Sequence, residues 1–68
     1  MIVIIDEVLK RKGRTRYWLT KHVGITYQNM KKICDNETSA IRFDVLERIC
    51  IALECEPSDI FKIERMIK

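Results

Sequence analysis

Four polar side chains near the middle of the chain could make hydrogen bonds from one face of a helix: Tyr27, Gln28, Lys31 and Lys32. Their spacing follows the period of an α-helix, so they share one side of it. That side has nothing apolar to bury, and it presents hydrogen-bonding groups and two cations on a narrow rod. A rod of this diameter fits the major groove of DNA, whereas the alternative is an ordinary solvated helix face.

Two short helices joined by a tight turn, over about residues 16–34, are predicted to position this face. Gly24 falls where the first helix must end with a positive φ, and Thr26 offers its hydroxyl as the N-cap of the second helix. So short a connector makes the helices cross steeply and bury one apolar set: Leu19, Val23, Ile25, Met30 and Ile33. This arrangement is a helix-turn-helix.

Start and stop signals predict another helix before this pair. Asp6 is expected to be the N-cap of a helix through about Lys12, which Gly13 ends. Thr15 then caps the helix that carries Trp18, whose ring is expected to cover the edge of the core.

The second half is predicted to hold two further helices. Residues 34–40 indicate a loop in which Asn36 can adopt the left-handed conformation. A helix begins near Asp44, which forms a capping-box pattern with Glu47, and Pro57 fits the first position of a last short helix. The side chains expected inside are Ile41, Phe43, Leu46, Ile49, Cys50, Leu53, Ile60 and Phe61.

Both ends of the chain have strand-like sequences. Residues 2–5 are apolar and β-branched, and residues 61–65 alternate between apolar and polar. They could pair with each other or across a dimer, because an isolated two-stranded ribbon is marginal in water. The apolar ends, residues 2–5 and 63–67, are therefore the candidate dimer surface.

Length and composition bound the class of protein. The 68 residues fit one small domain, residues 1–68, and an apolar fraction of 47% fits a packed globule. Only two glycines and one proline predict a mostly helical chain. The sequence has no apolar run of about 20 residues that could span a membrane and no signal-peptide pattern, so we expect a cytoplasmic protein.

The sequence shows no constellation typical of catalysis or metal binding. The three cysteines form no Cys-x-x-Cys pair and His22 is remote from them, so buried free thiols are expected rather than a zinc site. A glycine-rich phosphate loop and a nucleophile–base pair are also missing. We therefore expect no enzyme activity, no cofactor, no metal and no small-molecule ligand.

Charge is distributed unevenly along the chain, whose net charge is +3. The basic residues Lys10, Arg11, Lys12, Arg14, Arg16, Lys21, Lys31 and Lys32 fall in the first half, and the acids Asp44, Glu47, Glu54, Glu56 and Asp59 in the second. The asymmetry favours a basic face toward a polyanion, and the alternative is a set of ordinary solvated charges.

The order of these features resembles the Cro/repressor-type helix-turn-helix domains of the XRE family, and in particular small stand-alone bacterial or mobile-element regulators. The resemblance covers nearly the whole chain and rests on Lys12-Gly13-x-Thr15, on the helix-turn-helix set, and on the stretch from Asp44 to Ile60. It implies an all-α, compact five-helix domain, with or without short terminal β-strands. It also implies a sequence-specific transcriptional regulator that reads a pseudo-palindromic operator as a homodimer on double-stranded DNA.

By position, the resemblance implies that DNA is contacted by Arg16, Tyr27, Gln28, Lys32 and Arg42. Lys31 lies beside Lys32, and Thr26 begins a helix whose first amides suit a phosphate, so both are predicted to contact DNA as well. Those on the second helix of the motif would reach bases, while Arg16 and Arg42 would approach phosphates. Two departures from the family pattern are Thr20, where a smaller residue is usual, and Cys34-Asp35-Asn36, which brings negative charge near the DNA face.

A second hypothesis keeps the same fold but a different function. A protein-interaction module, such as an antitoxin-like partner, would need a large exposed apolar patch. Ile63, Met66 and Ile67 could supply that patch.

Overall fold

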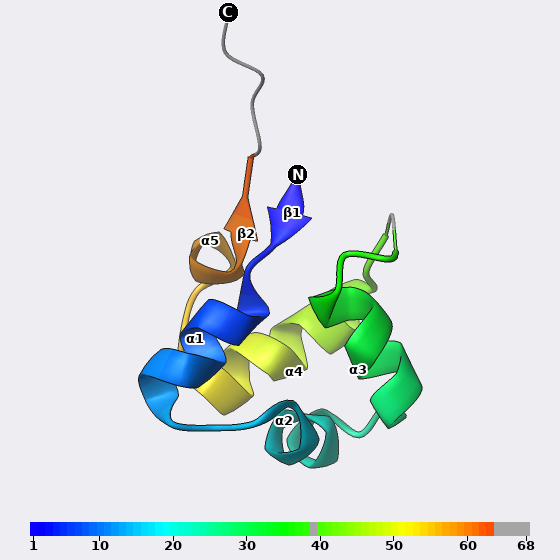
Figure 1. Ribbon diagram of the computed structural model, residues 1–68, viewed down its shortest axis with the longest axis vertical. Coiled ribbons are helices and arrows are strands. Elements are labelled where there is room, and N and C mark those ends of the chain that lie inside the picture. The colour runs from blue at the N-terminus through cyan, green and yellow to red at the C-terminus, as the bar shows by residue number, and fades with distance from the viewer. Residues whose placement is uncertain (39, 64–68) are drawn as a thin grey trace, which may run out of the picture.

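The computed structural model describes residues 1–38 and 40–63, in which five short helices surround one core and two short strands lie side by side at one end of it (Figure 1). In chain order the elements are β1 (Ile2–Val3), α1 (Ile5–Lys12), α2 (Arg16–Val23), α3 (Tyr27–Cys34), α4 (Phe43–Leu53), α5 (Pro57–Ile60) and β2 (Phe61–Lys62). The predicted all-α domain with short terminal strands is confirmed.

Hydroxyl caps and a left-handed glycine set the ends of α2 and α3. Thr15 Oγ1 accepts a hydrogen bond from the Trp18 amide at 3.1 Å, and Thr26 Oγ1 accepts one from the Asn29 amide at 3.2 Å. Gly24 has a φ of 82°, as predicted. Arg48 of α4 supports this turn, since its Nη1 donates to the Val23 carbonyl at 3.3 Å. These predicted helix boundaries are confirmed.

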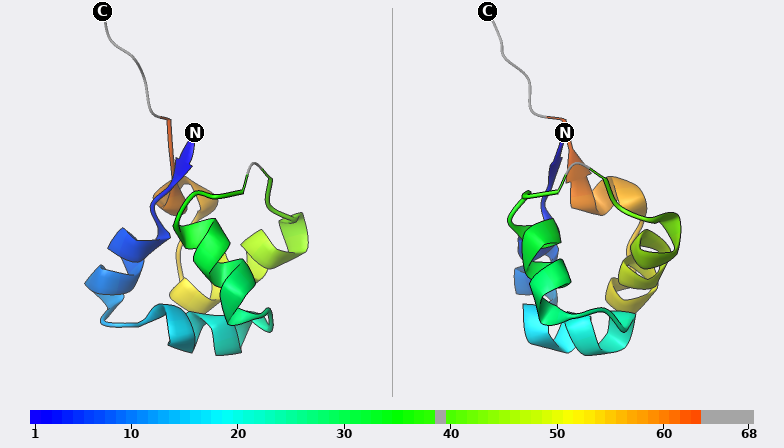
Figure 2. Two further views of the ribbon diagram at one scale, coloured as in Figure 1. Left: turned by 45° about the vertical axis from the view of Figure 1, so that its right-hand side comes forward. Right: turned by 90° about the vertical axis from the view of Figure 1, so that its right-hand side faces the viewer.

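The core lies between the helices, and α2 packs against both α3 and α4. In the right-hand view of Figure 2, α3 and α4 stand on opposite sides of the core and α2 runs across one end. The fully or nearly fully buried side chains include Leu19, Val23, Met30, Ile33, Ile49, Cys50, Leu53 and Ile60. Half-buried side chains packed on this core include Trp18, Ile25, Ile41, Leu46 and Phe61. The predicted core is thus confirmed apart from Phe43.

Phe43 is 88% exposed, so its predicted inward position is wrong. It is the first residue of α4 and lies six positions before the buried Ile49. At about 100° per residue, its side chain points roughly 120° away from that of Ile49 around the helix axis. Phe43 therefore lies on the outer side of α4.

Two predicted N-caps are also wrong, because their carboxylates have other partners. Asp6 lies inside the first turn of α1, whose N-cap is Ile4, and its side chain binds Arg16. Asp44 lies inside the first turn of α4, whose N-cap is Arg42, and it accepts hydrogen bonds from the Val45 amide and the Arg42 side chain. In both helices the N-cap lies two residues before the carboxylate predicted for that position.

The two ends of the chain pair as an antiparallel ribbon, with Ile2 opposite Lys62 and Val3 opposite Phe61. The ribbon continues into the helices because the Ile4 amide donates to the Ile60 carbonyl at 2.8 Å. Of the two pairings predicted for the termini, the structure shows the one within a single chain, with strands shorter than the predicted segments because Ile5 already begins α1. Of the predicted apolar dimer surface at residues 63–67, Ile63 is 65% exposed, and the other residues lie outside the described part of the chain. Within the described part of the chain, no helix has the length and hydropathy needed to cross a bilayer.

Candidate nucleic-acid interface

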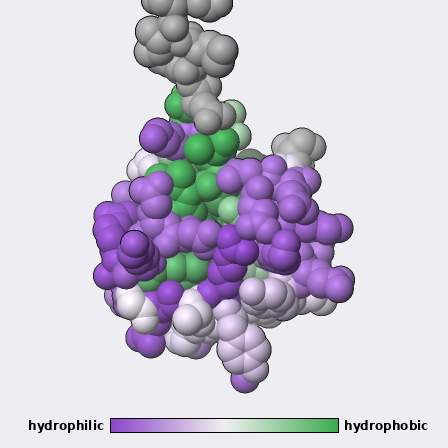
Figure 3. All heavy atoms as spheres, viewed as in Figure 1, coloured by the Kyte–Doolittle hydropathy of each residue, from purple (hydrophilic) through white to green (hydrophobic). Residues whose placement is uncertain are grey.

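The outer face of α3 is polar and open to solvent. Tyr27 is 48% exposed, and Gln28, Lys31 and Lys32 are exposed as well. The opposite face of the helix is buried through Met30, Ile33 and Cys34. Figure 3 shows hydrophilic side chains over α1 and α3, with a hydrophobic strip between them. The side chains that the sequence placed on one face are therefore brought together there.

The N-terminal end of α3 adds main-chain donors to this face. Thr26 is exposed, and its hydroxyl satisfies the Asn29 amide. The first amides of a helix otherwise lack partners within it, so they suit an anionic ligand. This end of α3 is the part of the face best suited to a phosphate group.

A groove of about 200 Å³ connects α3 with the segment that leads into α4. Lys32 and Asn29 line it from α3, and Arg42 and Val45 line it from the other side. Arg42 forms an exposed ion pair with Asp44, with an Nε–Oδ1 distance of 3.2 Å. Among the described residues, Lys32 has no ion-pair partner. The predicted residues Lys32 and Arg42 thus present their charges beside the same groove.

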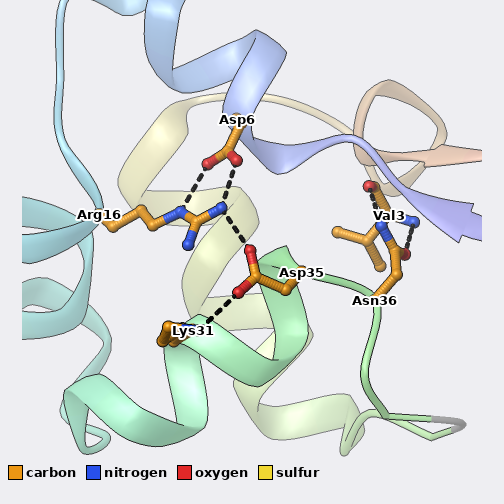
Figure 4. Close-up of polar contacts among 6 residues, drawn as sticks. All are labelled: Val3, Asp6, Arg16, Lys31, Asp35 and Asn36. Atoms are coloured by element: carbon orange, nitrogen blue, oxygen red, sulfur yellow. Dashed lines mark hydrogen bonds and ion pairs between the residues drawn. The ribbon is translucent and has the colours of Figure 1, made fainter.

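Arg16 and Lys31 are held differently, since both bind carboxylates (Figure 4). The Arg16 guanidinium binds both oxygens of Asp6 on α1, with an Nε–Oδ1 distance of 2.9 Å. Its Nη2 also lies 2.8 Å from Oδ1 of Asp35, at the end of α3. Lys31 Nζ lies 3.0 Å from the other Asp35 oxygen. This ion-pair network links α1, α2 and α3.

The network shifts the titration of its members in the directions expected for paired charges. Hydrogen bonds from Lys31 and then Arg16 hold the pKa of the Asp35 carboxyl below its ordinary value. The hydrogen bond to Asp35 raises the pKa of Lys31, and the hydrogen bond to Asp6 does most to raise the pKa of Arg16. All three groups are therefore charged near neutral pH.

The negative charge of Asp35 near this face was predicted from the sequence, but the ion pairs of Asp6 and Asp35 were not. The contact between Lys31 and Asp35 had a local signal, because opposite charges at i and i+4 on a helix are neighbours. The contact between Asp6 and Arg16 had none, since it joins two helices ten residues apart in sequence. Thr20 is buried and its hydroxyl donates to the Arg16 carbonyl at 2.7 Å, so the larger side chain fits with its polar group satisfied.

The remaining titratable candidates do not form a reactive site. His22 is exposed and stacks on Trp18 with a ring-centroid distance of 4.2 Å. Burial raises the pKa of the Cys34 thiol and that of the Cys50 thiol to about 11 each. In the described part of the chain, His, Cys, Asp and Glu form no cluster of three or more that could hold a metal ion.

The arrangement of α2, the Gly24 turn and an exposed α3 is that of a helix-turn-helix DNA-binding domain. The sequence model of the Cro/C1-type HTH DNA-binding domain matches residues 5–65, and the chain belongs to this family. It is therefore a DNA-binding domain and not an enzyme.

Two known proteins are similar over most of their length. The chain is 39% identical over 62 residues to YozG of Bacillus subtilis (strain 168), described as an uncharacterized HTH-type transcriptional regulator; the match covers 91% of this chain and 74% of YozG. The fold is similar to the crystal structure of a candidate DNA-binding protein from Bacteroides fragilis, with a TM-score of 0.76 and 25% identity. That match covers 87% of this chain and 94% of the other.

Proposed function

We propose that the protein is a sequence-specific transcriptional regulator that reads operator DNA with α3 in the major groove. The observation that carries this proposal is the exposed polar face of α3, held by a helix-turn-helix whose inner side is fully packed. The similarity to YozG, whose name describes an HTH-type transcriptional regulator, supports the regulatory role. A regulator that binds genomic DNA in a bacterial cell works in the cytoplasm.

The predicted contacts divide by chemistry. Tyr27 and Gln28 stand in the first turn of α3, where side chains reach base edges, and Gln can pair with adenine through two hydrogen bonds. Lys32 can reach guanine or a phosphate. Arg42 and the amides that follow Thr26 suit phosphates, which fix the register of the protein on the duplex.

The function is tested by selecting bound duplexes from a random DNA pool and titrating the winner against a scrambled control. A sequence-specific regulator is expected to enrich one motif and to bind it at least about 10³-fold more tightly than the control. Equal, strongly salt-dependent binding to every duplex would leave only a basic surface and would contradict the proposal.

We also propose that the protein binds as a homodimer on a pseudo-palindromic operator, with half-sites one helical turn or a multiple of it apart. The described part of the chain offers an exposed apolar surface for this on α4, where Phe43 is 88% exposed and Ile51 69%. Both line an open groove of about 600 Å³ that Leu46, Cys50 and Pro57 also line. Phe43 directly follows Arg42, so a contact with a second copy there would adjoin the DNA face.

The alternative function is a protein-interaction module with the same fold, and it is supported by the same exposed apolar side chains of α4, Phe43 and Ile51. Large exposed apolar side chains on one helix face are typical of protein contacts. The selection experiment separates the two functions, because an interaction module would show no preferred duplex.

A further inference from the structure

Asp35 uses both of its carboxylate oxygens on cations of the proposed DNA interface. Oδ1 lies 2.8 Å from Arg16 Nη2, and Oδ2 lies 3.0 Å from Lys31 Nζ (Figure 4). The Asp35 side chain is only 28% exposed, while that of Lys31 is 54% exposed. The carboxylate is thus fixed beside the polar face of α3, and Lys31 folds back toward it.

The charges of the network cancel. Two carboxylates, Asp6 and Asp35, face two cations, Arg16 and Lys31, so the group has no net charge. Two residues that the sequence assigned to DNA contact are therefore neutralised within the protein. Lys32 remains without an ion-pair partner among the described residues.

A phosphate that approaches Lys31 competes with Asp35 for its ammonium group, which lies 3.0 Å from Oδ2 of that carboxylate. If the ammonium group moves to a phosphate, the freed carboxylate remains close to the DNA, well inside the Debye length of about 8–10 Å at physiological salt. Like charges at this range repel, so each step of the exchange opposes binding. Phosphates are alike in every sequence, so the resulting penalty is the same for every duplex.

We propose that Asp35 sets the strength of DNA binding: its carboxylate competes with the DNA phosphates for Lys31 and weakens binding to all sequences alike. This inference rests on the proposed function, since it concerns the same interface. It assigns an acidic residue that acts against binding, whereas every residue assigned above acts in favour of it.

Arg16 and Lys31 respond differently to the loss of the Asp35 charge. Arg16 keeps Asp6, which binds its guanidinium through two hydrogen bonds. Within the described residues, Lys31 has Asp35 as its single ion-pair partner. Removing the charge of Asp35 is therefore expected to free one cation, Lys31, for one additional phosphate contact.

The test is Asp35→Asn, which keeps the size of the side chain and removes its charge. Affinity for the selected duplex and for a scrambled duplex is measured at several salt concentrations between about 50 and 200 mM. Both duplexes are expected to bind more tightly by the same factor, with the salt slope steeper by about 0.9 for each protomer bound. The gain is accordingly expected to shrink about threefold for each protomer bound across this range of salt.

Two further variants isolate the mechanism. Glu7→Gln removes one negative charge from an exposed residue of α1 that has no ion pair among the described residues, and it is expected to leave the salt slope unchanged. Lys31→Met is expected to lower the slope by well under one unit and to abolish the gain from Asp35→Asn in the double variant. If Asp35→Asn does not fold, Lys31→Met alone decides, because a loss of about 0.9 in the salt slope for each protomer bound would mean that Lys31 already binds a phosphate in the wild type.

The inference is overturned if Asp35→Asn leaves the slope unchanged, if Glu7→Gln steepens it equally, or if the gain persists without Lys31. These results are distinguishable from failure of the proposed function, which would appear as equal binding of the wild type to both duplexes. The salt slope on either duplex still decides the role of Asp35 in that case.

Discussion

Gln28 is the residue whose role in reading a base can be tested most directly. It is exposed in the first turn of α3, and its amide can both donate to and accept from adenine. Gln28→Ala is expected to cost about 1–3 kcal/mol of binding at one base-pair position and to relax the preference there. Competition with operators that each carry one changed base pair measures this loss. Arg42→Ala, at a residue assigned to phosphates, is the comparison and is expected to weaken all duplexes alike, so an equally uniform loss for Gln28→Ala would contradict its role.

At the same scale, burial controls the chemistry of the thiols. Cys34 and Cys50 are 6% and 9% exposed, and burial raises the pKa of each to about 11. With this pKa, only about one thiol in a thousand is ionised at pH 8. Both thiols are therefore expected to react slowly, because the thiolate is the reactive form. Alkylation followed by mass spectrometry is expected to modify the half-buried Cys55 first. Fast modification of Cys34 in the folded protein would contradict this order.

At the scale of the elements, the turn between α2 and α3 depends on the backbone conformation of one residue, Gly24. Gly24 has a φ of 82°, and the nearest side-chain atom to an added Cβ would be Arg48 Nη1 at 4.0 Å. Gly24→Ala would therefore meet strain but no clash and is expected to destabilise the domain by about 1 kcal/mol. Urea unfolding measures the change. Gly24→Asn should cost less, because Asn tolerates the left-handed region better, and the reverse order would contradict this explanation.

Elements were predictable from the sequence where their signals are local. Thr15, Thr26 and Gly24 act on neighbours within four residues, and all three boundaries are confirmed. Asp6 has the same local signal as these caps, but an arginine ten residues away binds its carboxylate instead. The polar face of α3 was likewise predictable from its period, whereas the ion pairs that cancel two of its cations depend on how three helices pack. A sequence pattern carries no such tertiary information.

For the whole molecule, the ion-pair network predicts a loss of stability in acid. The pKa of Asp35 is lowered in the folded state, so its charge stabilises the fold above the ordinary Asp value of about 3.9. This contribution is lost as the pH falls through the lower folded-state pKa. The urea midpoint is therefore expected to fall below about pH 4, and less steeply in Asp35→Asn than in the wild type. An identical acid dependence in the two proteins would exclude a contribution from this carboxylate.

Assembly is tested on the exposed side of α4. Phe43→Ser removes an apolar side chain that is 88% exposed, so the fold of one chain is expected to be unaffected. If a second copy covers Phe43, the loss of that burial should raise the dimer dissociation constant about tenfold or more. Sedimentation equilibrium measures the constant, with Lys62→Ser as the control at the ribbon. An unchanged constant would place the dimer contact elsewhere.

Asn36 determines how the terminal ribbon can grow. It has a φ of 62°, and its side-chain amide donates to the Val3 carbonyl at 3.2 Å and accepts from the Val3 amide at 2.6 Å. One amide side chain thus makes both bonds that a neighbouring strand would make to β1, and this edge is closed to any further strand. A sheet with a closed edge can add a strand only beyond β2. Strand addition between copies would therefore stop at a pair, and this ribbon cannot seed a filament.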